Sequence, residues 1–196
     1  MTQKRNLDRQ KVINKATEII NEKGLSELTM PNLAKALGVR SQSLYHYVSN
    51  LDELLSLVCA ERLKVLRAHL TEKLIGYSGN DALYLFADET REFLLNDRTV
   101  SSIFYNLEAY INNQLITDEI NKIIDLGEKI VNIDKKNTVS LHGLLAAVLG
   151  YVFLDRADLF KNEDKKSADD NYHELLSRLV SPTTKSKKVK KLGKDN

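Results

Sequence analysis

The stretch Thr29-Met-Pro-Asn-Leu-Ala-Lys-Ala-Leu-Gly-Val-Arg-Ser-Gln-Ser-Leu-Tyr-His-Tyr-Val48 has the pattern of two short helices joined by a tight turn. Thr29 can cap the first helix with its hydroxyl, and Pro31 suits a first turn, where its missing N–H costs little. Gly38 supplies the left-handed conformation that ends this helix, and Ser41 can cap the second. The stretch therefore predicts a helix-turn-helix, a common means of placing a helix in the major groove of DNA.

The second helix of this motif carries polar and aromatic residues on the side away from Leu44 and Val48, its expected core residues. Arg, Gln and Ser side chains can bond to phosphates and base edges, and tyrosine hydroxyls suit phosphate oxygens. We predict DNA contacts at Thr29, Arg40, Ser41, Gln42, Ser43, Tyr45, His46, Tyr47 and Asn50. These twenty residues alone leave open a plain helical hairpin whose polar side chains are only solvated.

Both flanks of the motif favour the DNA-binding alternative. An apolar stripe predicts a helix from about Asp8 to Lys23, ended by Gly24, so that three helices enclose a small core. The stripe consists of Val12, Ile13, Ala16, Ile19 and Ile20. Downstream, Asn50 and Glu53 form a capping-box pattern that opens a long fourth helix.

The segment from about Val12 to Leu55 resembles the TetR family of bacterial regulators. The matching residues are Ala16, Ile20, Gly24, Leu28-Thr29, Leu33-Ala34, Leu37-Gly38-Val39, Ser41, Leu44-Tyr45-His46-Tyr47 and Asp52-Glu53-Leu54-Leu55. Pro31 stands where the family often has an arginine, and Leu51 stands where it usually has a lysine. These departures remove a base contact and a phosphate contact that other members have available.

We predict an all-α fold of about nine helices. Only two prolines occur, Pro31 and Pro182, which favours a nearly continuous series of helices between them. The helix-turn-helix domain is expected at 1–49, a larger helical ligand-binding and dimerisation domain at 50–181, and a basic, disordered tail at 182–196. In the larger domain, helices are expected at about 51–75, from a cap at Asn80 to about 94, and then at about 100–111, 120–131, 136–160 and 168–180.

Charge is distributed unevenly, although the net charge is only +2. Residues 1–49 hold eight Lys and Arg against four Asp and Glu, and residues 182–196 hold six Lys against one Asp, which leaves −7 for the remainder. A basic head on an acidic body suits a DNA-binding protein with a separate effector domain. Lys4, Arg5 and Arg9 form either an arm along DNA or a solvated terminus, and the tail either adds nonspecific DNA affinity or has no role.

The larger domain contains two further predicted sites. Small residues four apart, in a helix that is apolar around most of its girth, predict a helix contact there. The resemblance implies that the last two long helices form a dimer interface, so we expect a seam at Gly143, Ala147, Gly150, Leu175 and Leu179. It also implies a largely apolar effector pocket, for which the lining candidates are His69, Phe86, Phe93, Phe104, Tyr105, Glu108, Tyr110 and His142. Ordinary core packing is the alternative for each of these aromatic and histidine residues.

The sequence carries few signals of other chemistry. The single cysteine, Cys59, excludes an intrachain disulfide and is interpreted as a small buried residue rather than a redox sensor. The sequence shows no charged-then-apolar leader and no apolar run near the 18 residues of a membrane-spanning helix, so we expect a cytoplasmic protein. We expect no metal, cofactor or catalytic site, because no ligand cluster, serine elbow or phosphate-binding glycine loop is found.

Together these patterns predict a homodimeric repressor that binds a near-palindromic operator and is released by a small effector. The alternative within the same class is a regulator without an effector, whose larger domain only dimerises or binds a protein. Two alternatives come from other functional classes. A helical-bundle enzyme is disfavoured, because the sequence lacks the paired Glu-x-x-His motifs of di-iron bundles. A membrane-surface or scaffold protein is supported by the basic tail alone.

Overall fold

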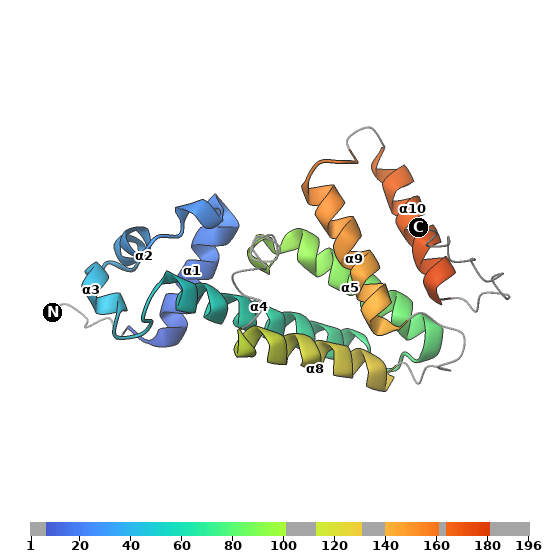
Figure 1. Ribbon diagram of the computed structural model, residues 1–196, viewed down its shortest axis with the longest axis horizontal. Coiled ribbons are helices and arrows are strands. Elements are labelled where there is room, and N and C mark those ends of the chain that lie inside the picture. Colours follow the sequence, from blue (N-terminus) through green and yellow to red (C-terminus); the bar gives the residue numbers. More distant parts are fainter. Residues whose placement is uncertain (1–6, 101–112, 131–139, 161–163, 181–196) are drawn as a thin grey trace, which may run out of the picture.

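The computed structural model describes residues 7–100, 113–130, 140–160 and 164–180, and every regular element within these ranges is helical (Figure 1). A small N-terminal group of helices lies at one end of the molecule and a larger helical body at the other, and α4 (Leu51–Lys73) runs between them. This arrangement confirms the predicted all-α architecture.

The N-terminal group contains α1 (Arg9–Lys23), a short 3₁₀ turn (Leu25–Glu27), α2 (Met30–Leu37) and α3 (Ser41–Leu44). Asp8 accepts a hydrogen bond from the backbone N–H of Lys11 and so caps α1, which ends at Gly24 with a φ of 96°. The predicted stripe on α1 is buried throughout and packs with Leu33 and Leu44. Three amphipathic helices thus enclose a small core.

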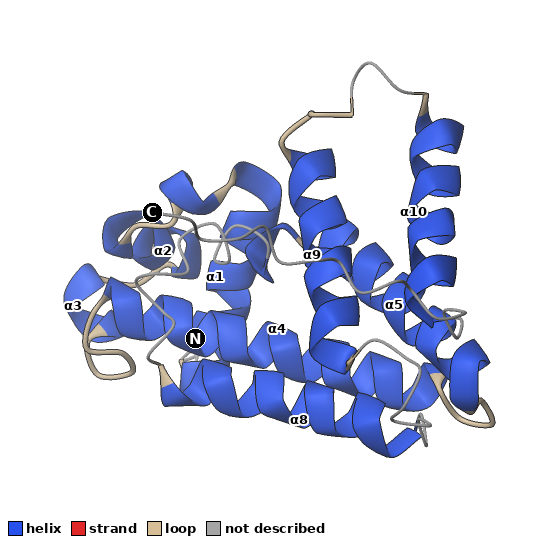
Figure 2. Cartoon of the chain, turned by 45° about the vertical axis from the view of Figure 1, so that its right-hand side comes forward, coloured by secondary structure: helices blue, strands red, loops and turns tan. Residues whose placement is uncertain are grey.

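The body contains α5 (Gly79–Asn96), α8 (Gln114–Ile130), α9 (Leu141–Arg156) and α10 (Lys165–Val180). Helices α4 and α8 lie side by side, α9 crosses α5, and α10 packs on both α5 and α9 (Figure 2). The close approach of α8 to α9 depends on Gly127, since a Cβ there would lie 2.5 Å from Leu141 Cδ2. Phe86 and Tyr172 are among the largest fully buried side chains in this body.

Several helix ends differ from the expected ones. The second helix of the motif ends at Leu44 and continues as a turn to Tyr47, and its N-cap is Arg40 rather than Ser41. Helix α5 is preceded by Ser78 rather than capped by Asn80, and α9 is shorter than the predicted 136–160. The helix expected at about 100–111 lies largely outside the described residues, whereas the one expected at about 120–131 is α8, which begins earlier, at Gln114. In contrast, the helical spacing of Leu83, Phe86, Ala87, Thr90 and Leu94 predicts one inner face on α5, and these residues are buried.

Candidate DNA interface and ligand cavity

The turn between α2 and α3 has the geometry that the sequence predicts. The Thr29 hydroxyl accepts the backbone N–H of Asn32 at 3.2 Å, and Pro31 lies in the first turn of α2. Gly38 has a left-handed conformation, with φ 68° and ψ 34°, and the N–H of Val39 bonds to the Ala34 carbonyl at 3.0 Å. The amino end of α3 is therefore held at a fixed angle to α2.

The predicted DNA contacts differ in accessibility. Arg40, Gln42, Tyr45 and His46 are exposed, and Tyr45 retains 55% of its accessible surface. Ser41, Ser43 and Thr29 are half-buried. Asn50 is exposed, but its amide oxygen caps α4 by accepting the N–H of Glu53 at 2.8 Å. A ligand that approaches the amino end of α3 thus meets the exposed Arg40 and Gln42.

Tyr47 has a different environment from the one expected. Its ring is half-buried against the core, and its hydroxyl donates a hydrogen bond to the backbone carbonyl of Leu7 at 2.8 Å. The expectation of an exposed Tyr47 was wrong, because the chain leaves the helical path after Leu44 and turns this ring toward the segment that precedes α1. The hydroxyl joins two segments that are 40 residues apart.

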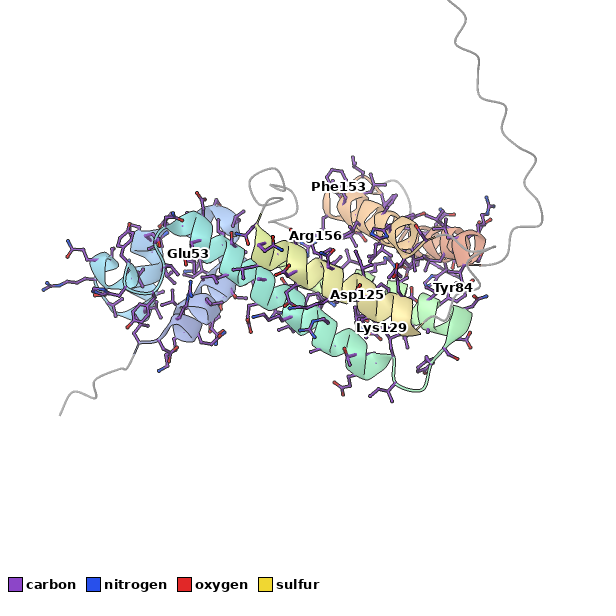
Figure 3. The ribbon with its side chains drawn as sticks, turned by 60° about the horizontal axis from the view of Figure 1, so that its bottom comes forward. Glu53, Tyr84, Asp125, Lys129, Phe153 and Arg156 are labelled. Carbon is purple, nitrogen blue, oxygen red and sulfur yellow. The ribbon has the colours of Figure 1, made fainter. Side chains whose placement is uncertain are left out.

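The amino end of α4 is tied to α1 through Glu53, which is labelled in Figure 3. One oxygen of Glu53 accepts the N–H of Ser49 at 2.6 Å, and the other pairs with Arg9 at 2.5 Å. The bond from Ser49, reinforced by the Arg9 charge, lowers the pKa of Glu53. Arg9 therefore has a structural partner, while Lys4 and Arg5 lie outside the described residues.

Residues 12–58 match the family model of bacterial regulatory proteins of the tetR family. This N-terminal part of the chain belongs to the TetR family. Such a DNA-binding domain makes the protein a DNA-binding transcriptional regulator. The matched residues include the whole helix-turn-helix and the first eight residues of α4.

Solved structures extend this assignment of the fold to most of the chain. BioQ from Mycobacterium smegmatis is 21% identical with a TM-score of 0.60, and the match covers 89% of this chain and 96% of that one. FadR from Bacillus subtilis in complex with stearoyl-CoA is 20% identical with a TM-score of 0.61, and covers 88% and 97%. BioQ with its double-stranded DNA operator is 20% identical with a TM-score of 0.56, and covers 89% and 98%. No curated protein matches the chain by sequence.

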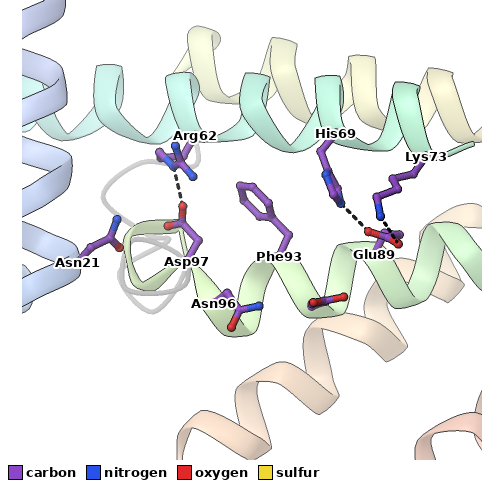
Figure 4. Close-up of a pocket in the computed structure, with 9 residues that line it drawn as sticks. Asn21, Arg62, His69, Lys73, Glu89, Phe93, Asn96 and Asp97 are labelled. Carbon is purple, nitrogen blue, oxygen red and sulfur yellow. Dashed lines mark hydrogen bonds and ion pairs between the residues drawn. The ribbon is translucent and has the colours of Figure 1, made fainter.

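A cavity of about 310 Å³ lies where the N-terminal domain of this chain meets the body (Figure 4). We call it the junction cavity. Its lining comes from α1, α4, α5 and the residue after α5, and consists of Asn21, Arg62, His69, Lys73, Glu89, Glu92, Phe93, Asn96 and Asp97. This lining is mostly polar, unlike the largely apolar pocket expected.

Two charge clusters face each other across Phe93 in the junction cavity. Glu89 Oε2 lies 2.5 Å from His69 Nε2, and Glu89 Oε1 lies 3.5 Å from Lys73 Nζ. At the other end, Arg62 Nε donates to Asp97 at 2.6 Å, and its guanidinium lies 5.5 Å from the centre of the Phe93 ring. The cavity thus presents cations, carboxylates and one flat aromatic face.

The expected pocket residues separate into three groups. His69 and Phe93 line the junction cavity, whereas Phe86 is fully buried in the core between α5 and its neighbours. His142 is exposed on α9 and does not line this cavity. The remaining four candidates lie outside the described residues: Phe104, Tyr105, Glu108 and Tyr110. Sequence spacing did not single out Asn21, Arg62 or Asp97, because their meeting depends on tertiary contacts.

The expected dimer seam lies on α9 and α10. Gly143 and Ala147 are half-buried, as are Leu175 and Leu179, and Gly150 is exposed with open space beside it. Phe153 is 51% exposed, because α9 buries its other side, at Leu144, Val148 and Val152. Part of the apolar face of α9 is therefore accessible in a single chain.

Cys59 lies inside the core, 1% exposed. Burial, with a contribution from the nearby Asp97 charge, raises the pKa of Cys59 to about 12. Its environment is that of the small buried residue that the sequence predicts. Among the described residues, no three His, Cys, Asp or Glu side chains form a group able to hold a metal ion, and no helix has the length and apolarity needed to cross a membrane.

Proposed function

We propose that this chain is a homodimeric repressor that binds a near-palindromic operator and is released by a small molecule in the junction cavity. The position of the cavity carries the proposal. Asn21 belongs to α1, which packs on α2 of the helix-turn-helix, while Arg62 and Glu89 belong to α4 and α5 of the body. A bound molecule would therefore contact both domains at once.

The DNA side of the proposal rests on the exposed amino end of α3. We propose that Arg40, Gln42 and Ser43 contact base edges and that Tyr45 and His46 contact the DNA backbone; all but the half-buried Ser43 are exposed. The side chains of Thr29, Tyr47 and Asn50 bond within the protein instead, and Ser41 stays a proposed DNA contact. Two copies of α3 would enter successive major grooves about 34 to 36 Å apart, or somewhat more. The similar structure of BioQ with its operator supports DNA as the partner.

We propose that two copies associate through α9 and α10, at Gly143, Ala147, Gly150, Leu175 and Leu179. The accessible part of α9 supports this, since Leu149 is 37% exposed beside those small residues. A two-fold interface would use the same patch on both copies. Residues 1–49 and 50–181 are the proposed domains, and α4 belongs structurally to both.

The polar lining of the junction cavity favours an effector with charged or hydrogen-bonding groups and one flat face for Phe93. The structure of FadR with stearoyl-CoA supports a small molecule as partner of this fold. If the effector binds the conformation released from DNA more tightly than the DNA-bound one, a difference of a few kcal/mol is enough to empty an operator.

The test has two stages. Selection of bound sequences from a random DNA pool would give the operator, and fluorescence anisotropy would then screen small molecules that release it. His69→Ala should weaken release by an active compound, whereas His142→Ala, a matched change outside the cavity, should not. A palindromic operator with no releasing compound would favour the regulator without an effector. Equal effects of the two histidine variants would place the effector elsewhere.

A further inference from the structure

One buried carboxylate, that of Asp97, joins the helices that meet at the junction cavity. Asp97, 5% exposed, follows α5 directly. Its Oδ2 accepts Arg62 Nε of α4 at 2.6 Å, and its Oδ1 accepts the N–H groups of Thr99 and Val100 at 2.8 and 3.2 Å. A buried charge is costly unless it is paired and hydrogen-bonded, so these contacts are expected to hold Asp97 in one position.

The next residues connect this carboxylate to the N-terminal domain. Thr99 is fully buried, and its hydroxyl donates to Asn21 Oδ1 at 3.1 Å. Asn21 lies on α1, which packs directly on α2. The path from Arg62 through Asp97 and Thr99 thus reaches the helix that supports the DNA-binding motif.

A third helix holds the same point from the other side. Arg156, in the last turn of α9 and labelled in Figure 3, donates to the Leu94 carbonyl at 2.8 Å and to the Leu95 carbonyl at 2.8 Å. These are among the last carbonyls of α5, which have no partner within their own helix. A cation at a helix carboxyl end is also favoured by the helix dipole. Helices α4, α5 and α9 therefore meet at the carboxyl end of α5. Thr99, which contacts α1, follows that end closely in the sequence.

We propose that Asp97 is a positioning residue that sets the orientation of the DNA-binding domain relative to the body, and that Thr99 transmits it to α1 through Asn21. Arg62 and Asp97 also line the junction cavity, so a molecule bound there would act on this same contact. That last step extends the proposed release by a small molecule. The positioning role of Asp97 does not depend on a bound small molecule, because its contacts lie within the DNA-binding domain and the body.

The experiment measures the distance between the two domains directly. Spin labels on Ser26→Cys, in the exposed 3₁₀ turn, and on Asp81→Cys, exposed on α5, report their separation by pulsed electron paramagnetic resonance. Cys59 is buried and stays unlabelled. Labelled chains are diluted with unlabelled ones, so that an assembly carries at most one labelled copy.

Thr99→Val removes the hydroxyl that reaches Asn21, and Thr99→Ser keeps it. Thr90→Val is the matched control, because Thr90 is also buried near the end of α5 but bonds only to the Phe86 carbonyl of its own helix. We expect Thr99→Val and Asp97→Asn to broaden or shift the distance distribution and to weaken operator binding by about fivefold or more. Thr99→Ser and Thr90→Val should retain the wild-type distribution.

The proposal is overturned if folded Thr99→Val gives the wild-type distribution, or if Thr90→Val broadens it equally. Thermal unfolding of each variant shows whether the protein is folded, and the two valine variants are expected to lose similar stability. Because the distance is measured without DNA or a small molecule, failure to find an effector leaves this test intact.

Discussion

Replacing Tyr47 with phenylalanine should destabilise the protein without removing a DNA contact. The change deletes only the hydroxyl that donates to the Leu7 carbonyl at 2.8 Å, and the ring can keep its packing against the core. Sequence reasoning gives the opposite expectation, since an exposed Tyr47 hydroxyl would bond to a phosphate and leave stability unchanged.

The size of the effect follows from the environment of this bond. A typical intramolecular hydrogen bond contributes about 0.5–1.5 kcal/mol net. Tyr47 is only half-buried, so water can partly replace the lost partner of Leu7, and we expect a loss of about 1 kcal/mol in the free energy of unfolding. In a chain of this length, that corresponds to a fall of about 2–4 °C in Tm.

Urea and thermal unfolding would measure the stability change, and titration of operator and random DNA at several salt concentrations would measure affinity. Tyr45→Phe is the control, because the exposed Tyr45 hydroxyl has no hydrogen-bond partner among the described residues. We expect Tyr45→Phe to keep its Tm and to bind both DNAs more weakly. An unchanged Tm for Tyr47→Phe, with weaker binding to both DNAs, would refute the assignment of its hydroxyl to Leu7.

Three further changes test other parts of the molecule. Gln42→Ala should cost on the order of 1–3 kcal/mol on the best operator and relax the preference at one symmetric base position; an identical selected motif would show that Gln42 does not contact bases. Ala147→Arg places a long charged side chain in the proposed seam and should give a folded monomer by sedimentation, and a fully active dimer would place the seam elsewhere. Burial opposes ionisation of Glu119, but bonds from Lys122 and Arg67 outweigh it and lower its pKa below the ordinary 4.5. The stability this gives is present above pH 4.5 and lost as the pH falls through the lowered pKa, so the urea-unfolding difference between Glu119→Gln and wild type should shrink in acid.

The parts of the fold that were predictable from sequence depend on local patterns. The two ends of α1 can be located to within one helical turn from Asp8, Gly24 and the apolar stripe between them. This is possible because capping and periodicity act over a few residues. The inner face of α5 was predictable for the same reason. These signals require no knowledge of neighbouring helices.

The contacts that define the site could not be predicted in this way. Thr99 and Asn21 are 78 residues apart, and Arg62 and Asp97 are 35 apart, so their meeting depends on how whole helices pack. Single polar residues at such positions look like solvated surface residues in the sequence. For this reason the sequence does not reveal the polar lining of the junction cavity, whereas aromatic residues at helical spacing stand out.

The way α4 is buried explains how two domains of this chain can influence each other. Its amino-terminal part packs on α1 and its later turns pack on α5 and α8, with Leu54, Val58 and Leu70 buried along its length. The buried side chains of both domains form one continuous hydrophobic cluster. A domain boundary at residue 49 therefore does not coincide with any gap in the packing. The family match to residue 58 likewise extends into α4. Because close-packed interiors transmit displacement rather than absorb it, a shift of α4 at Arg62 must also move the surface on which α1 rests.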